Sequence, residues 1–212
     1  MTTIATTRTT AGALRTVPAI AGVGYALSWV IALSIPVPSN GFGDSGSSLV
    51  AKIAGHSAAM DTNNLFSEGL PAIGLVIISL WLARAAGWSR AGRITAIAGA
   101  VAATISVVEF GIGLALARTT TPDTAHLLFG SLNRLDGVKM FVLAVMGVAA
   151  AMTGVLPRWL RYTGIAMAIA IAGSGIAYLL LNSGLATLAY VSLPLLIVFV
   201  TGTGIVLGRS AE

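Results

Sequence analysis

The feature that most constrains this chain is an interval of 47 residues without a charged side chain, Tyr162 to Gly208. About 20 apolar residues in a helix cross the hydrocarbon core of a bilayer. The interval is therefore too long for one crossing and long enough for two, with a turn at Asn182-Ser183-Gly184. A second uncharged interval, Thr16 to Gly43, allows one more crossing. These intervals predict a chain that folds inside a membrane.

The composition supports this prediction. Charged residues make up only 9% of the 212 residues and apolar residues 56%, whereas an ordinary soluble domain has roughly 25% charged residues. The net charge is +5, but the basic residues are scattered along the chain, and a nucleic-acid surface needs them gathered in a patch. We therefore expect no nucleic-acid partner. The absence of cysteine excludes disulfides and thiolate metal sites.

We predict an all-α integral membrane protein, a bundle of six transmembrane helices. The first four spans are expected at residues 18–35, 65–86, 94–117 and 135–156, and the last two within 162–208. Residues 17–208 would form one domain, after a disordered tail at 1–16 and before a short C-terminus at 209–212. Eight basic residues fall on one side of this topology and four on the other, which puts both termini in the cytoplasm.

Two outer loops carry apolar residues at roughly helical spacing. They are Ser47 to Asn63, with Val50 and Ile53, and Pro122 to Arg134, with Leu127 and Leu128. We predict one short amphipathic helix in each loop, lying at the outer surface as a lid.

A shift of 68 residues superposes the second and third spans on the fourth and fifth. Glu68-Gly69 then falls on Asp136-Gly137, and the pair Arg90 and Arg93 falls on the pair Arg158 and Arg161. This register predicts a tandem repeat of helical hairpins. Under the repeat, Glu68 and Asp136 are candidates for an architectural role, and the arginine pairs are typical of cytoplasmic anchors.

Glu109 is the strongest candidate for a functional residue, because an acid within a span costs roughly 2.5–3.5 kcal/mol on insertion scales. It is expected about 12 Å below the outer boundary, at 1.5 Å per helical residue. Lys139, one turn below Asp136, would come from the same side and could meet it. Two interpretations stay open. A Glu109–Lys139 pair would fix the packing of two spans, and Glu109 would then stay ionised. Alternatively, Glu109 forms the floor of an outward-facing polar pocket, with Glu68, Asp136 and Lys139 as further ligand-binding residues.

No cofactor is expected, and no metal site. His56 and His126 have no metal-binding spacing and are expected to be solvated in the two loop helices, although a mixed site with Asp61, Glu68 and Asp136 is chemically possible. Two stripes of small residues, Gly202 to Gly208 and Gly164 to Ala172, are typical of close helix packing and would also suit a homodimer.

The run Gly154 to Gly164, GVLPRWLRYTG, precedes an apolar span containing Gly175-Ile176-Ala177-Tyr178-Leu179. Together with Val107-Val108-Glu109, this pattern resembles the bacterial membrane family catalogued as domain of unknown function 4386. The resemblance covers about Arg15 to Leu207. It implies a six-helix protein of the bacterial cytoplasmic membrane and gives functional weight to Glu109, but it implies no activity.

Three functions are compatible with these observations. The first is binding or transport of a small lipophilic or cationic molecule in the outward-facing pocket. The second is an intramembrane enzyme, such as an isomerase or cyclase, that uses Glu109 as general acid or base. The third is an accessory subunit of a membrane complex, in which the polar residues only fix packing.

Overall fold

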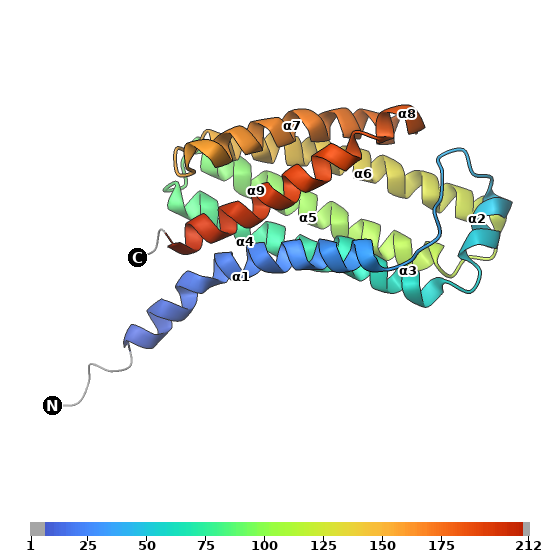
Figure 1. Cartoon of the computed structure of the whole chain (residues 1–212), viewed down its shortest axis with the longest axis horizontal. Coiled ribbons are helices and arrows are strands. Elements are labelled where there is room, and N and C mark those ends of the chain that lie inside the picture. The colour runs from blue at the N-terminus through green and yellow to red at the C-terminus, as the bar shows by residue number, and fades with distance from the viewer. Residues whose placement is uncertain (1–6, 210–212) are drawn as a thin grey trace.

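The computed structural model describes residues 7–209, with side chains from Thr16 onward, and every regular element in that range is a helix. The elements run in this order: α1 Thr7–Ser34, α2 Gly46–Ile53, α3 Ser57–Asn64, the π-helical turn η1 Leu65–Gly69, α4 Leu70–Ala85, α5 Arg90–Leu116, α6 Pro122–Ala151, α7 Arg158–Leu179, α8 Ser183–Ala186 and α9 Ala189–Arg209. Figure 1 shows the long helices side by side in one bundle, with α2 and α3 at one end.

Five helical segments are long and apolar enough to cross a membrane. They are Thr16–Ser34, Ser57–Ala85, Arg90–Leu116, Arg158–Leu179 and Ser183–Arg209. The 30-residue helix α6 is not among these five, and it carries Arg134, Asp136 and Lys139 close together. The coarse prediction of an all-helical protein compatible with a membrane is therefore confirmed.

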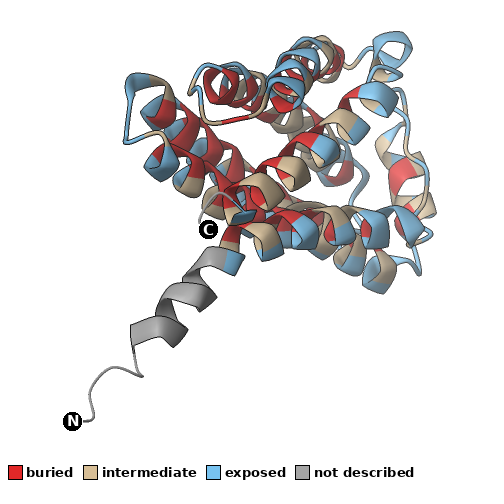
Figure 2. Cartoon of the chain, turned by 60° about the vertical axis from the view of Figure 1, so that its left-hand side comes forward, coloured by how far each residue is buried: buried red, intermediate tan, exposed pale blue. Residues whose placement is uncertain are grey.

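The long helices bury one face and leave the other apolar and exposed. Figure 2 shows buried residues on the faces that the helices turn toward one another. The core between them includes Leu75, Leu82, Met146, Leu160 and Phe199. Large apolar side chains on the outward faces, such as Ile20, Ile97 and Ile169, are more than 60% exposed. A soluble protein rarely exposes so much apolar surface, whereas acyl chains would cover it in a membrane.

The two predicted stripes of small residues pack within this chain. A Cβ added to Gly204 would come 2.4 Å from the carbonyl oxygen of Pro18, so α9 and α1 cross in close contact. A Cβ on Gly164 would come 3.1 Å from the carbonyl oxygen of Gly147, which brings α7 against α6. These glycines therefore serve helix packing inside the bundle, and a homodimer through the rest of these faces stays a prediction.

The predicted lid helix at Pro122 to Arg134 is not a separate element. It is the first part of α6, which runs without a break from Pro122 to Ala151. Pro122 stands in the first turn, where a helix tolerates proline, and no later proline interrupts the helix. The sequence prediction placed the span boundary at the charged residues Arg134 and Asp136, but charge alone does not end a helix.

The first outer loop contains two short helices where one was predicted. The chain turns between α2 and α3 at Gly55, whose φ of +79° is a conformation that glycine adopts without strain. Leu49 and Ile53 of α2 are buried against Leu116 and Ala125, so α2 caps the ends of α5 and α6. The short helix α3 continues through η1 into α4 without leaving the helical conformation. At Leu65, where the second span was predicted to begin, the α-helix changes to a π-helical turn.

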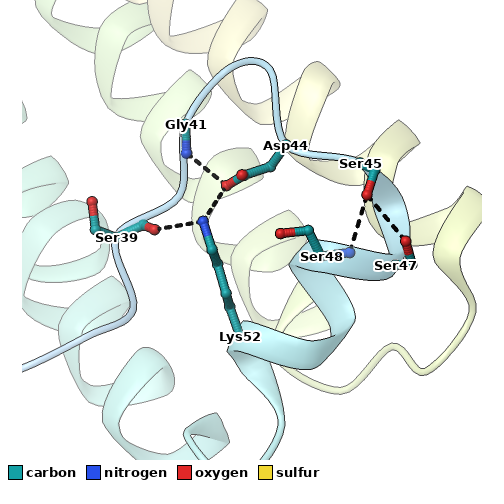
Figure 3. A network of polar contacts seen from close by, with 7 residues as sticks. All are labelled: Ser39, Gly41, Asp44, Ser45, Ser47, Ser48 and Lys52. Carbon is teal, nitrogen blue, oxygen red and sulfur yellow. Dashed lines mark hydrogen bonds and ion pairs between the residues drawn. The ribbon is translucent and has the colours of Figure 1, made fainter.

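Two ion pairs whose cations reach solvent lie at the end of the bundle near α2 and α3. Lys52 of α2 reaches back to the preceding loop, where its Nζ donates to Asp44 Oδ2 at 2.7 Å and to the Ser39 carbonyl at 3.1 Å (Figure 3). Lys52 and the amide of Gly41, which donates to the same carboxylate at 2.8 Å, lower the pKa of Asp44. Arg118 donates to both oxygens of Asp61, at 2.6 and 2.9 Å, and this carboxylate raises the pKa of Arg118.

The terminal regions fit the predicted boundaries in part. The turn between the last two long helices lies where the sequence predicted it, and the side chain of Asn182 accepts a hydrogen bond from the amide of Leu185 at 3.2 Å. At the other end, α1 already begins at Thr7, inside the segment 1–16 that was assigned to a disordered tail. Residues 1–6 and 210–212 of the predicted termini lie outside the described residues. The beginning of α1 and the end of α9 lie at the same end of the bundle (Figure 1).

Candidate functional site

The four predicted ligand-binding residues meet in one cluster inside the bundle. Glu68 lies on η1, Glu109 on α5, and Asp136 and Lys139 on α6. Lys139 Nζ is 2.8 Å from Glu68 Oε2 and 2.9 Å from Asp136 Oδ1, and it donates a hydrogen bond to Glu109 Oε2. The predicted meeting of Glu109 and Lys139 is therefore confirmed.

The cluster is most deeply buried at Glu109. The side chain of Glu109 is 1% exposed and that of Lys139 is 8% exposed, whereas Glu68 and Asp136 keep 17% and 20%. With all groups ionised, three carboxylates surround one ammonium, which leaves two uncompensated negative charges. Buried charge is costly unless it is balanced, so this arrangement attracts a further positive charge.

One oxygen of Glu109 has no hydrogen-bond partner among the described residues. Oε2 accepts from Lys139, while Oε1 is buried and unpaired. An unsatisfied buried acceptor typically costs about 1–3 kcal/mol, and more when it is charged. The most buried carboxylate of the cluster can therefore accept one more hydrogen bond or bind a cation.

Local helix geometry places these side chains. Glu68 lies in the π-helical turn, a feature that often marks functional sites because the wider turn changes the direction of the side chains within it. Gly137, next to Asp136, lets α6 approach α7 closely, since a Cβ there would come 3.0 Å from the Gly175 carbonyl oxygen. The sequence predicted neither the π-helical turn nor this contact, although the acid-Gly pairs at both sites marked the positions.

Tyr25 of α1 is a further member of the site that the sequence analysis missed. Its side chain is buried, and it lies close enough to interact electrostatically with Lys139, Glu68 and Asp136. Tyrosine within an uncharged span was the available signal, because a buried phenolic hydroxyl usually has a polar neighbour. Four helical segments (α1, η1, α5 and α6) thus contribute polar groups to one region.

Tyr25 also lines a groove between α1 and α4. The groove has a volume of about 410 Å³ and is otherwise mostly aliphatic, with Phe66 and Ser28 among its lining residues. The hydroxyl of Ser28 is buried and has no partner among the described residues. Tyr25 is thus shared between this apolar groove and the polar cluster, whereas the charged residues of the cluster do not line the groove.

The larger cavity of the molecule lies elsewhere. A trough of about 810 Å³ is formed by α5, α6 and α7 near Arg90, and a smaller pocket of about 310 Å³ lies beside Arg118. The outward-facing polar pocket therefore stays a prediction, and the α1–α4 groove reaches the region of the cluster through Tyr25.

The cluster is also where a cation ligand set is found. Oxygen atoms of Glu68, Glu109 and Asp136 lie within 4.8 Å of one another, and carboxylate oxygens are suitable ligands for hard cations. The other polar residues considered from the sequence are not part of it. His56 and His126 are exposed, and Asp61 is engaged with Arg118.

The chain was compared with family models, curated proteins and solved structures, and none of the three comparisons gave a match. The resemblance to the family catalogued as domain of unknown function 4386 therefore stays a prediction.

Proposed function

We propose that this chain is a membrane protein that binds, and moves across the bilayer, a small lipophilic cation. The observation that carries the proposal is the convergence of three carboxylates on one buried lysine, with Glu109 Oε1 unpaired. A monovalent cation beside Glu109 would supply the missing partner and reduce the excess of negative charge. Lys139 would remain bound to Glu68 and Asp136 while this happens.

The groove between α1 and α4 supports a ligand that is lipophilic as well as cationic. Its aliphatic lining suits an apolar body, and Tyr25 and Phe66 offer ring faces on which a cation is stabilised. Such a molecule would enter sideways from the bilayer, with its charge directed toward Glu109. An inorganic cation would gain little from this aliphatic approach.

The proposed topology has six crossings, with α6 as the crossing added to the five apolar segments. The start of α1 and the end of α9 lie at the same end of the bundle, which is consistent with an even number of crossings (Figure 1). The distribution of basic residues favours cytoplasmic termini in a bacterial plasma membrane. The hairpins α4–α5 and α6–α7 would be the two copies of the tandem repeat, with Glu68 and Asp136 as its matching acids.

The alternative of an intramembrane isomerase or cyclase has less support. It needs a substrate-sized cavity at Glu109, whereas this side chain is 1% exposed and its Oε2 is held by Lys139. An accessory subunit would explain the packing but offers no reason for three acids around one lysine.

The proposal is tested by measuring the binding of tetraphenylphosphonium to the purified protein in detergent. We expect Glu109→Gln to weaken binding by at least tenfold, while the variant stays monodisperse and helical. Asp123→Asn removes an exposed acid at the start of α6 and is the matched control, which should bind like the parent.

A neutral probe of the same shape, tetraphenylsilane, separates charge recognition from simple partitioning. We expect the parent protein to prefer the phosphonium strongly. Equal binding of the two probes, or normal phosphonium binding by a folded Glu109→Gln variant, would refute the proposal.

A further inference from the structure

The trough formed by α5, α6 and α7 is the largest cavity described, at about 810 Å³, near the upper end of the range of about 300–1,000 Å³ for ligand pockets. Helix α6 packs against both α5 and α7, and the three helices enclose the trough between them. Its lining is aliphatic except at one place, the exposed side chain of Arg90. Aliphatic residues from the three helices include Ile94, Ala144, Val148, Ala149, Ile165 and Ile169.

Arg90 has no hydrogen-bond or ion-pair partner within the described part of the chain. Five other arginines lie at the same end of the long helices (Figure 1): Arg84, Arg93, Arg158, Arg161 and Arg209. All six acids of residues 7–209 fall elsewhere, from the loop before α2 to the middle of α6. This end of the bundle therefore offers unbalanced positive charge beside an apolar trough.

We propose that the trough binds an anionic phospholipid, with one acyl chain along α6 and the phosphate at Arg90. The guanidinium is well suited to phosphate, because it donates several hydrogen bonds in a planar array. Basic sites between transmembrane helices are a known means of holding anionic head groups. The inference is independent of the cation site, which lies in another part of the bundle.

The lining argues against other occupants. An extended peptide would leave its backbone amides and carbonyls unpaired, because Arg90 is the one charged side chain of an otherwise aliphatic trough. A parallel second copy of this chain would present its own arginines at this level and no acid from the described residues. A lipid fits both the aliphatic lining and the positive charge, because its acyl chain needs no hydrogen bonds and its head group carries the negative charge.

Native mass spectrometry of the full chain, released from nanodiscs that contain equal amounts of phosphatidylglycerol and phosphatidylcholine, tests the proposal. We expect the parent to retain phosphatidylglycerol preferentially. Arg90→Gln should lower this preference about fivefold, the effect of about 1 kcal/mol for one basic residue near an anionic surface. Arg84→Gln is the matched control, because this exposed arginine lies at the same end and does not line the trough.

A second variant fills the apolar part of the trough. Ala172→Phe should release the lipid, whereas Ala170→Phe, on the same helix but outside the trough, should not. Ala144→Leu serves the same purpose if Ala172→Phe does not fold. Equal retention of the two lipids by the parent, or equal effects of Arg90→Gln and Arg84→Gln, would overturn the proposal. So would displacement of the lipid by free glycerol phosphate at similar concentrations, because the acyl chain would then contribute nothing.

Discussion

The charged groups of this protein fall into two kinds of region. Near α2 and α3, Lys52 pairs with Asp44 and Arg118 with Asp61, and each exposed pair balances one cation with one acid. Inside the bundle, a single lysine meets three carboxylates and is almost fully buried. The cations of the exposed pairs are 38% and 59% exposed, against 8% for Lys139, so water screens these pairs. The buried cluster is neither screened nor balanced, and this difference makes it the candidate site.

The comparison also separates stability from function. An exposed ion pair contributes little to the free energy of unfolding, because hydration replaces most of what the pair gains. A buried cluster is costly to assemble and still more costly to break. If the cluster served packing alone, a balanced pair or an apolar contact would achieve the same result with less charge.

The largest effect is expected for Lys139→Met. Removing the ammonium leaves three buried carboxylates without their common partner, and breaking a buried ion pair typically costs about 3–5 kcal/mol. We expect a large loss of thermal stability in detergent, followed by circular dichroism at neutral pH. A variant as stable as the parent would show that the cluster is hydrated and resembles the exposed pairs.

The next effect is the coupling between Glu109 and Lys139. In a double-mutant cycle with Glu109→Gln and Lys139→Met, we expect a coupling energy within about 0.5–3 kcal/mol, the range for residues in contact. The single variant Glu109→Gln should destabilise less than Lys139→Met, because Lys139 keeps Glu68 and Asp136 as partners. Strictly additive effects would contradict the direct contact.

A smaller effect is expected for the exposed pair at the end of α5. Arg118→Gln and Asp61→Asn should each leave the unfolding temperature close to that of the parent, because water replaces the lost partner. A double-mutant cycle that combines these two substitutions should give no coupling energy at high salt. A coupling as large as that of the buried cluster would remove the distinction between the two regions.

The smallest effect is the pH dependence contributed by Asp44. Its pKa is lowered in the folded state, so its contribution to stability is present above the ordinary value of 3.8 and is lost as the pH falls through the lowered value. We expect the parent to be slightly more stable than Asp44→Asn at neutral pH, with the difference vanishing in acid. A difference that grows as the pH falls would contradict this sign.

Much of the fold follows from the spacing of charged residues, because long apolar intervals have few folds open to them. The uncharged interval from Tyr162 predicted α7 and α9 and the turn at Asn182. The same reasoning misplaced the start of the fourth long helix. Residues up to Arg134 were assigned to a separate short helix before the span, whereas the local backbone has no reason to leave the helix there and α6 is continuous.

The candidate site could be predicted in its members but not in its geometry. Acids and a lysine inside apolar segments are rare enough to single out Glu109 and Lys139. The part played by Tyr25 depends on how α1 lies against the other helices, which no local pattern contains. The π-helical turn at Glu68 was likewise not predicted, although Pro71 follows it closely and cannot donate the regular helical hydrogen bond to the Ser67 carbonyl.

The unbroken course of α6 has a mechanical consequence. Its first turns pack against α2, its middle carries Asp136 and Lys139, and its last turns line the trough shared with α5 and α7. A continuous helix can rotate about its axis as one body. A small rotation of α6 would therefore shift α2, the charged groups and the trough together. If α6 crosses the bilayer as proposed, changes at either of its ends would reach the same carboxylates.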